Sequence, residues 1–195
     1  MPLKLSGRTE PRCKQVKTDA IQVQTGKNTF LNVAPVQSQA YRDAMSHYAG
    51  AVQVVTTDGT AGRRGVTLTA SCSVSDNPPT VLICLQKIHE ENRLFLENSV
   101  FAINTLSGSQ EQLAEAFSGR IGLTQDERFE LAEWDILSTG APALVGALAV
   151  FDCRVTSVQD HSTHYVLFGE VAALRASTDD EALIYLNRRY HRLEL

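Results

Sequence analysis

The sequence predicts a mainly β domain, in which an antiparallel sheet or barrel carries a few flanking helices. The predicted strands outnumber the predicted helices, and they follow one another in groups. A parallel sheet would instead need strands and helices in alternation. The chain has 195 residues, of which 43% are hydrophobic, so its length and composition suit one globular domain with or without an appendage.

The longest apolar run covers residues 141–151 and is interrupted by Pro142 and Gly146. Its eleven residues are too few to span a bilayer, so we expect no membrane partner. Residues 1–24 lack the apolar stretch that precedes the cleavage site of a secretory signal. We therefore expect a cytoplasmic protein.

Charge is distributed unevenly along the chain. Residues 1–38 hold six basic and two acidic side chains, whereas residues 39–195 hold twelve basic and twenty acidic ones. Nucleic-acid binding requires clustered Lys and Arg, so the acidic body predicts no nucleic-acid partner. We expect residues 1–37 to form a basic, loosely ordered extension and residues 38–195 to form the folded domain. The extension is either a solvated arm or a docking arm for an acidic partner.

The first elements of the domain are predicted from capping and periodicity. Ser38 is placed to cap a helix over residues 39–48, and a β-branched run ends at the turn signal Asp58-Gly59. Residues 66–75 alternate hydroxyl and apolar side chains, which predicts one strand. The hydroxyl face of that strand would hold Thr67, Thr69, Ser71, Ser73 and Ser75. The apolar run 80–86 predicts a strand buried on both faces.

The next part of the chain predicts a helix over residues 89–98 and a strand over 99–106. Two pairs, Ser107 with Gln110 and Thr124 with Glu127, have the spacing of capping boxes, so each predicts the start of a helix. Gly119 suits the end of the first of these helices. After the break at Gly140-Ala141-Pro142, three β-type stretches complete the sheet: residues 147–159, 163–176 and 181–191.

Several catalytic signatures do not occur in the sequence, namely a GxSxG elbow, an HExxH helix and a Walker loop. The glycines of residues 59–65 are spaced as GxxGxxG and precede a β-branched run, so they predict a hairpin loop and not a dinucleotide fold. The sequence has neither CxxC spacing nor metal-ligand spacing around its histidines, so we expect no metal. Reduced, buried thiols are predicted for the four cysteines: Cys13, Cys72, Cys84 and Cys153.

Two features have both a functional and an ordinary interpretation. The hydroxyl-lined strand could hold a polar ligand such as a flavin or a phosphate, or it could be a solvated sheet face. His164 stands at the start of a predicted strand, and residues 188–191 read Arg-Arg-Tyr-His. This second group could hold a phosphate or stack on a nucleotide, or it could be a solvated terminus. The residue pattern alone favours the solvated alternatives.

Segments spread over residues 38–195 resemble one family in the same order and register. The segment YRDAMSHYAGAVQVVTTDG and the following GRRGVTLTASCSVSDNPPTVLICL are similar to the opening of the short-chain NAD(P)H:flavin oxidoreductases. These proteins are the reductase components of two-component monooxygenases, such as 4-hydroxyphenylacetate 3-monooxygenase. The resemblance continues in FAINTLS, AFSGRIGLTQDERF, THYVLFGEV and LIYLNRRYH.

The resemblance implies an FMN-binding split barrel with Greek-key connections that works as a homodimer. In this family NADH or NADPH passes a hydride to FMN or FAD, and the reduced flavin diffuses to a separate oxygenase. The flavin site implied by the resemblance consists of Thr67, Leu68, Thr69, Ala70, Ser73, Val74, Ser75, Cys84, Gln86, His89, Asn104 and Thr105. The nicotinamide nucleotide would be met by His164, Arg189, Tyr190 and His191.

The resemblance further implies that the oxygenase acts on a phenol-type aromatic substrate. It also implies that this chain needs no catalytic acid, base or nucleophile. A hydride passes directly between the two cofactors, so the protein supplies binding, orientation and electrostatics. The alternative is a split-barrel flavin-binding protein without nicotinamide turnover, acting as an electron carrier or a flavin-binding module.

Overall fold

The computed structural model describes residues 34–178 and 181–195, so most of the predicted extension over residues 1–37 lies outside the described residues, as does Cys13. A compact unit runs from Gln37 to Leu195. Its helical elements are α1 (Ser38–Met45), η1 (Glu90–Arg93), α2 (Leu94–Asn98), η2 (Gly108–Gln110), α3 (Glu111–Phe117) and α4 (Gln125–Phe129). Its strands are β1 (Gly50–Ala51), β2 (Gln53–Thr57), β3 (Arg64–Leu68), β4 (Ser71–Asp76), β5 (Pro79–Gln86), β6 (Val100–Thr105), β7 (Trp134–Ile136), β8 (Pro142–Leu144), β9 (Ala149–His161), β10 (His164–Ala176), β11 (Glu181–Leu186) and β12 (Arg189–Glu194).

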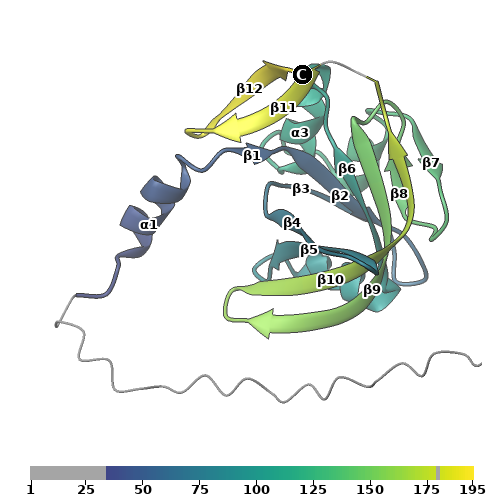
Figure 1. Ribbon diagram of the computed structural model, residues 1–195, viewed down its shortest axis with the longest axis horizontal. Helices are drawn as coiled ribbons and strands as arrows, with labels where there is room; N and C mark the ends of the chain where they lie inside the picture. Colours follow the sequence, from purple (N-terminus) through teal and green to yellow (C-terminus); the bar gives the residue numbers. More distant parts are fainter. Residues whose placement is uncertain (1–33, 179–180) are drawn as a thin grey trace, which may run out of the picture. The chain divides into compact units, whose positions relative to one another are not determined.

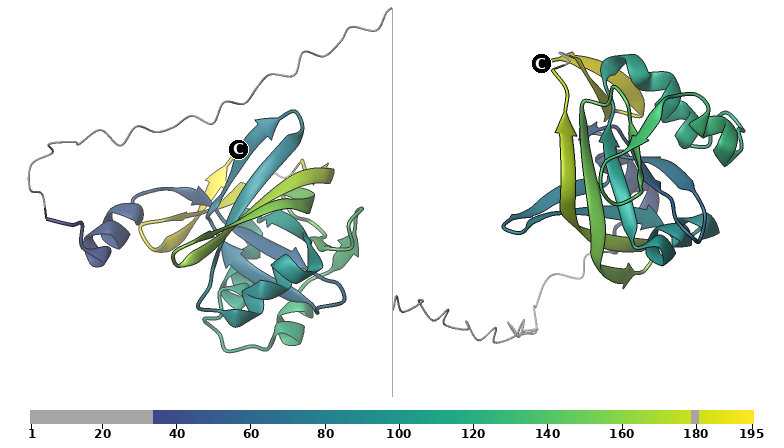
Figure 2. Two further views of the ribbon diagram at one scale, coloured as in Figure 1. Left: turned by 90° about the horizontal axis from the view of Figure 1, so that it is seen from below. Right: turned by 90° about the vertical axis from the view of Figure 1, so that its right-hand side faces the viewer.

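Seven strands of the described chain form one antiparallel sheet in the order β3-β2-β6-β9-β10-β5-β4 (Figure 1). The long β9–β10 hairpin joins the two halves of this sheet. Residues 149–154 of β9 pair with β6, while residues 164–170 of β10 pair with β5. Figure 2 shows the hairpin in green and yellow-green. The predicted mainly β, antiparallel fold class with flanking helices is therefore confirmed.

A small second sheet within the described residues consists of β1, β11 and β12 (Figure 1). Gly50 pairs with Tyr185 across β1 and β11, and Tyr185 pairs with Tyr190 across β11 and β12. Between β1 and β2, the Val52 amide donates to the carbonyl of Leu183 at 2.9 Å. This backbone bond ties the small sheet to the segment that continues into the large one.

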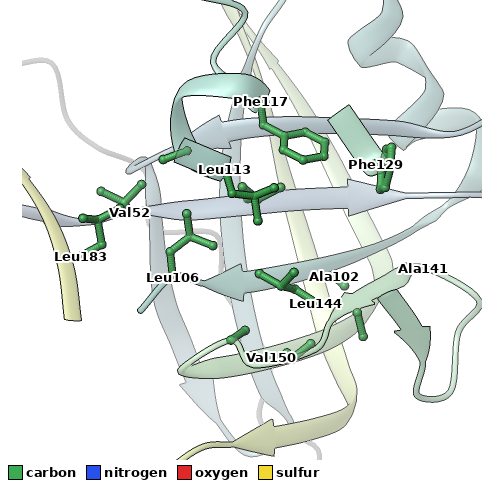
Figure 3. Packing of buried hydrophobic residues seen from close by; sticks show 14 residues of the cluster. Val52, Ala102, Leu106, Leu113, Phe117, Phe129, Ala141, Leu144, Val150 and Leu183 are labelled. Atoms are coloured by element: carbon green, nitrogen blue, oxygen red, sulfur yellow. The ribbon is translucent and has the colours of Figure 1, made fainter. Parts of the chain in front are cut away.

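The core consists of two clusters of buried apolar side chains. Val54 belongs to the first cluster and Val55 to the second, as expected for consecutive residues of a strand that face opposite sides of a sheet. Figure 3 shows the first cluster, in which Phe117 of α3 and Phe129 of α4 cover β3 and β2. Trp134 packs against both rings, with centroid distances of 5.7 and 5.0 Å. These contacts fix α3 and α4 against the sheet.

Both predicted capping boxes are confirmed. Ser107 and Gln110 begin η2, which leads into α3, and Thr124 and Glu127 begin α4. Gly119 follows α3 with φ +80°, a left-handed conformation that suits glycine at a helix end. The end of α3 is therefore set by local sequence, and it borders the site described below.

The single hydroxyl-lined strand predicted over residues 66–75 is wrong. β3 ends at Leu68 and β4 begins at Ser71, so the alternation of faces does not continue across the break at residues 69–70. The hydroxyls have different partners: Thr67 donates to Ala114 O, Ser71 donates to Gln53 Oε1, and Ser75 accepts from Asn77 N. The break arises because β3 pairs with β2, whereas β4 pairs with β5.

Two further strand predictions need correction. Residues 181–191 form a hairpin and not one strand, because Asn187 and Arg188 have φ values of 51° and 61°. Positive φ at two consecutive residues is the conformation of a tight two-residue hairpin turn. β5 is buried on one face only: Ile83 and Leu85 are buried, while Cys84 is half-buried because it lines a cavity.

Helix α1 begins one residue earlier than predicted, and Ser38 does not cap it. Gln37 holds the N-cap position without a side-chain hydrogen bond, and Ser38 is already helical. None of the residues of α1 is buried. Asp43 pairs with Arg188 at 2.5 Å, and the amide of Asn187 donates to Ser46 O at 2.6 Å. These contacts attach α1 to the turn between β11 and β12.

The described cysteines differ in exposure. Cys153 is buried, as predicted, and burial raises its pKa to about 12. Cys84 is intermediate and Cys72 is exposed. The prediction of a buried thiol is therefore wrong for Cys72, because it lies on β4, a strand at the edge of the large sheet.

Candidate functional site

A cavity of about 320 Å³, here called the central cavity, lies between the end of β3, the end of β5 and the start of β10. Eight residues predicted from the sequence line it: Thr67, Leu68, Thr69, Ala70, Cys84, Gln86, His89 and His164. The antiparallel pairing of β5 with β10 places Gln86 opposite His164, so segments far apart in the sequence meet here. The lining is completed by Val66, Leu85, Asn92 and Ser118.

The break between β3 and β4 forms one wall of the central cavity. Thr69 and Ala70 lie in this break, and both are exposed. The carbonyl of Ala70 accepts a hydrogen bond from the Cys84 amide at 2.9 Å, which holds the break against β5. The feature that makes the predicted continuous strand wrong is thus the one that brings Thr69 and Ala70 to the cavity.

A buried polar pair supports the opposite wall. Asn92 is 1% exposed, and its side-chain amide donates to the carbonyl of Gln86 at 2.8 Å. Its Oδ1 accepts from Arg64 Nε at 3.3 Å, and burial lowers the pKa of the Arg64 guanidinium. Asn92 therefore fixes the end of β5 and places a basic side chain behind the cavity wall.

His164 is held at the rim by the turn between β9 and β10. Its Nδ1 lies 2.8 Å from Thr163 Oγ1, which leaves Nε2 for a ligand. Lys87 ties this turn to the end of β5: its amide donates to Thr163 O at 3.0 Å, and its Nζ donates to Ser162 O at 2.9 Å and pairs with Asp160. The imidazole of His164 is thus carried by a turn that Lys87, the residue after β5, holds by several bonds.

Further cavities adjoin the central one and share residues with it. The hairpin cavity, of about 540 Å³, is lined by Gln86, Lys87, Ile88, Thr163 and His164. The tyrosine cavity, of about 350 Å³, shares Thr67, Leu68, Thr69, Gln86 and Ser118 with the central cavity and adds Val52, Arg120, Tyr185 and Tyr190. The three cavities thus share lining residues, and together they are called the groove.

The tyrosine cavity combines two rings with one cation. Tyr185 and Tyr190 have ring centroids 5.2 Å apart. The Arg120 guanidinium lies 6.0 Å from each centroid, and its Nη2 donates to the Tyr185 hydroxyl at 3.2 Å. This hydrogen bond raises the pKa of Arg120, and burial raises the pKa of Tyr190. The cavity therefore places one guanidinium beside two phenol rings.

Several predicted flavin residues lie outside these cavities. Ser73, Val74 and Ser75 are on β4, where the Val74 side chain is 47% exposed. Asn104 is fully buried in β6. Its side chain donates to Val54 O at 2.9 Å and to Thr56 Oγ1 at 3.2 Å, and it accepts from Leu144 N at 2.7 Å. Its neighbour Thr105 is half-buried within the sheet, between Gln53 and Ala149.

The predicted nicotinamide residues also separate. His164 and Tyr190 line the groove, but Arg189 and His191 are exposed and lie on the other face of β12 from Tyr190. The ring of His191 instead bonds the carbonyl of Leu186 through Nε2 at 3.2 Å. Adjacent residues of a strand face opposite sides of the sheet, so the motif Arg-Tyr-His contributes only Tyr190 to the lining of the groove.

Sequence reasoning missed Asn92, Ser118, Arg120 and Tyr185. The signal for Tyr185 was obscured by the assignment of residues 181–191 to one strand, because residues five apart on one strand face opposite sides. The hairpin instead pairs Tyr185 with Tyr190 directly. Ser118 and Arg120 flank Gly119, and the helix stop predicted there could have marked them as residues at an exposed helix end.

Comparison with known proteins identifies the family. Residues 45–194 match the model described as "Flavin reductase like domain". The chain belongs to the flavin reductase-like family. The match spans most of the compact unit, from the end of α1 to the end of β12.

Three flavin reductase-like proteins illustrate the similarity. The FMN reductase (NADH) RutF of Pantoea ananatis is 42% identical over 185 residues, which are 95% of this chain and 96% of that protein. The NADH:FAD oxidoreductase SgcE6 of Streptomyces globisporus has a TM-score of 0.74 at 27% identity, over 84% of this chain and 97% of that one. The styrene monooxygenase flavin reductase of Pseudomonas putida S12 has a TM-score of 0.67 at 28% identity, over 80% and 98%. The predicted split barrel is confirmed by this likeness.

The central cavity of this flavin reductase-like chain combines apolar and polar side chains. The apolar side chains of Leu68 and Leu85 lie beside the Thr69 hydroxyl, the Gln86 amide and the His164 imidazole, which can hydrogen-bond ring oxygens and nitrogens. Burial raises the pKa of the Cys84 thiol, so this cysteine is a weak nucleophile at neutral pH. The lining therefore favours binding and orientation over covalent catalysis.

Two further statements hold for residues 34–178 and 181–195, the part of the chain that the structure describes. No group of three or more His, Cys, Asp or Glu side chains in these ranges is placed to hold a metal ion. No helix in them is both long enough and apolar enough to cross a membrane.

Proposed function

We propose that the protein is an NADH-dependent flavin reductase, which transfers a hydride from reduced nicotinamide to FMN and releases the reduced flavin. One observation carries this proposal: the central cavity shares lining residues with two neighbouring cavities, as a site for two ligands in contact requires. The 42% identical relative named FMN reductase (NADH) supports the choice of cofactors. FAD, the flavin named for the structural neighbour SgcE6, is the second flavin to test.

The flavin is proposed to lie in the central cavity. Thr69 and Ala70, in the break between β3 and β4, approach one edge of the ring, and Leu68 supplies apolar contact. The Gln86 amide and the His89 imidazole offer hydrogen bonds near the end of β5, where the flavin phosphate would lie. Thr67 uses its hydroxyl proton on Ala114 O, so toward a ligand it serves as an acceptor. When bound, the flavin supplies the electron-accepting ring, and this chain supplies none of the redox chemistry.

The nicotinamide is proposed to stack over the flavin from the side of His164. Nε2 of His164 would donate to the carboxamide or ribose, and the turn bonded by Lys87 would keep the imidazole in place. Orientation of this kind is the main contribution that a protein can make to direct hydride transfer. Tyr190 borders the same groove from the small sheet.

The reduced flavin is proposed to pass to a separate oxygenase, and the reductase to act as a homodimer. The open groove supports release, since Gln86 and His89 at its rim are exposed. The name of the Pseudomonas putida S12 neighbour, a styrene monooxygenase flavin reductase, supports an oxygenase partner. Two statements about this protein stay predictions: that its own oxygenase partner acts on a phenol-type substrate, and that the protein is cytoplasmic.

A direct assay tests this proposal against the flavin-binding alternative. Purified full-length protein is mixed with NADH or NADPH, with and without FMN or FAD, and the nicotinamide absorbance is followed. We expect oxidation of NADH that depends on added flavin and is faster with FMN than with FAD. Flavin binding by fluorescence quenching without any nicotinamide oxidation would instead support a flavin-binding module.

A further inference from the structure

Arg120 is the cation of the tyrosine cavity, and the proposed chemistry leaves it without a role. Within the part of the chain that the structure describes, it forms no ion pair: its contacts are the Tyr185 hydroxyl and the faces of the Tyr185 and Tyr190 rings. Only one guanidinium N–H is used by the tyrosine hydroxyl, so the others are available. An arginine held in this way is suited to bind a phosphate.

Arg120 is exposed, and its contacts come from two directions. Gly119 closes α3 in a left-handed turn, which sets where the backbone of Arg120 leaves the helix. The tyrosine pair comes from the β11–β12 hairpin and meets the guanidinium from the other side. Pre-organisation of this kind lowers the entropy that a long side chain loses when it binds an anion.

The walls of the tyrosine cavity connect Arg120 to the rest of the groove. Thr67, Thr69, Gln86 and Ser118 line both this cavity and the central one. A ligand that extends past Ser118 from the central cavity would therefore enter the cavity that Arg120 lines. The flavin phosphate is proposed beside His89, which lines the central cavity but not the tyrosine cavity, and two phosphate-bearing ligands bound together repel least when their phosphates lie apart.

We propose that Arg120 binds a phosphate of the nicotinamide dinucleotide, and that Tyr185 and Tyr190 hold its guanidinium in place for this contact. This inference rests on the proposed NADH oxidation, and it assigns the tyrosine cavity to the phosphate-bearing part of the dinucleotide. The Tyr185 hydroxyl and both rings are positioning groups, whereas Arg120 touches the substrate. The flavin is not expected to touch Arg120.

The test compares two hydride donors with FMN as the acceptor. NADH carries phosphates, whereas 1-benzyl-1,4-dihydronicotinamide has the same reacting ring and none. In Arg120→Gln, we expect the KM for NADH to rise about tenfold, which is the loss of one charged hydrogen bond. The KM for the phosphate-free donor, the kcat with NADH and the Kd for FMN should stay at their wild-type values.

Three further variants sharpen the result. Arg120→Lys keeps the charge but loses the planar guanidinium, which can donate two parallel hydrogen bonds to one phosphate. Its KM for NADH should therefore lie between those of the wild type and Arg120→Gln. Tyr185→Phe removes only the hydroxyl and should raise the same KM by a smaller factor. Arg63→Gln is the matched control, because Arg63 also lies over an aromatic ring, 4.5 Å from the Phe129 centroid, but lines none of these cavities. It should leave the KM for NADH unchanged.

The inference is overturned if Arg120→Gln raises the KM values of both donors equally, or leaves both unchanged. A weaker Kd for FMN or FAD in this variant, with an unchanged KM for NADH, would assign the cavity to the flavin and would also overturn it. If the wild-type protein shows no flavin-dependent NADH oxidation at all, the proposed function fails first, and that result is distinct from either outcome.

Discussion

At the scale of single residues, burial decides which polar side chains are available to a ligand. Asn104 and His164 were both assigned to cofactors by resemblance, yet they occupy opposite situations. Asn104 is fully buried with its amide hydrogen-bonded at both ends, whereas His164 is half-buried on the groove with one nitrogen unused by Thr163. We therefore expect substitution of Asn104 to affect mainly stability and substitution of His164 to affect mainly ligand binding.

Asn104→Ala should mainly reduce stability. It removes partners from Val54 O and Leu144 N inside the sheet, and leaving buried groups unsatisfied costs about 3 kcal/mol in total. The measurement is the free energy of unfolding from urea titration, alongside the Kd for FMN in the absence of urea. Thr105→Ala, in the same strand, is the control and should cost much less. A large loss of FMN affinity with unchanged stability would contradict this placement.

His164→Ala should raise the KM for NADH more than it raises the Kd for FMN. The imidazole lines the side of the groove on which the nicotinamide is proposed to stack, and its truncation removes one donor there. His161 is a matched control, since it pairs with His164 across the same hairpin and is exposed. His161→Ala should leave both constants unchanged. Collapse of flavin affinity with a constant KM for NADH would show that His164 belongs to the flavin.

At the scale of elements, the two capping boxes were predicted correctly, whereas the Ser38 cap and two strand breaks were not. The capping boxes at Ser107 and Thr124 act within one helical turn, so four residues of sequence were enough to predict α3 and α4. The break at Thr69 depends instead on β3 and β4 choosing different partners, β2 and β5. The turn at Asn187 lacks the glycine that marks most two-residue hairpins, so the alternation appeared continuous.

The residues of the candidate site also divide into those predicted from their own segment of sequence and those that depend on contacts between distant elements. Thr69, Gln86 and His164 were located by resemblance, since each lies in a segment with a recognisable pattern. Arg120 and Tyr185 could not be located, because their significance arises only when the end of α3 meets the β11–β12 hairpin. A contact between distant elements leaves no local mark in the sequence.

The attachment of α1 should depend on pH through Asp43. The hydrogen bond from Arg188 lowers the pKa of this carboxyl, so the contact is present above the ordinary pKa of aspartate and weakens as the pH falls through the lowered value. Hydrogen exchange of the α1 amides should therefore accelerate in acid beyond its intrinsic rate. In Asp43→Asn, exchange should be fast already at neutral pH and show no such step.

The control for this experiment is Asp126→Asn, which removes another exposed ion pair, the one with Arg63. It should leave α1 exchange unchanged at every pH. Equal exchange in the wild type and Asp43→Asn at neutral pH would show that the backbone bond from Asn187 to Ser46 holds α1 by itself.

At the scale of the whole molecule, the net charge of −4 is the sum of a basic N-terminal segment, residues 1–38, and an acidic body, residues 39–195. The acidic body is proposed to bind two anionic cofactors, so recognition must rest on individual donors such as Gln86, His164 and Arg120 and not on overall attraction. Salt should therefore affect cofactor binding only through these local contacts.

Deletion of residues 1–36 should leave reductase turnover intact. The compact unit begins at Gln37, and the family match begins later still, at residue 45. The measurement is kcat and KM with FMN and NADH for the shortened and full-length proteins, together with their thermal unfolding temperatures. A large loss of turnover would mean that the extension takes part in the active assembly, and the predicted boundary at residue 38 would then be wrong.

The β11–β12 hairpin suggests a practical route to redesign. It is held by backbone bonds, including those of Val52 and Leu106 with Leu183, so its attachment does not depend on which side chains face the groove. Tyr185 and Tyr190 can thus be varied together in a combinatorial library while Leu183 is kept as the anchor. Selection on such a library could reprogramme the choice of hydride donor without redesigning the barrel.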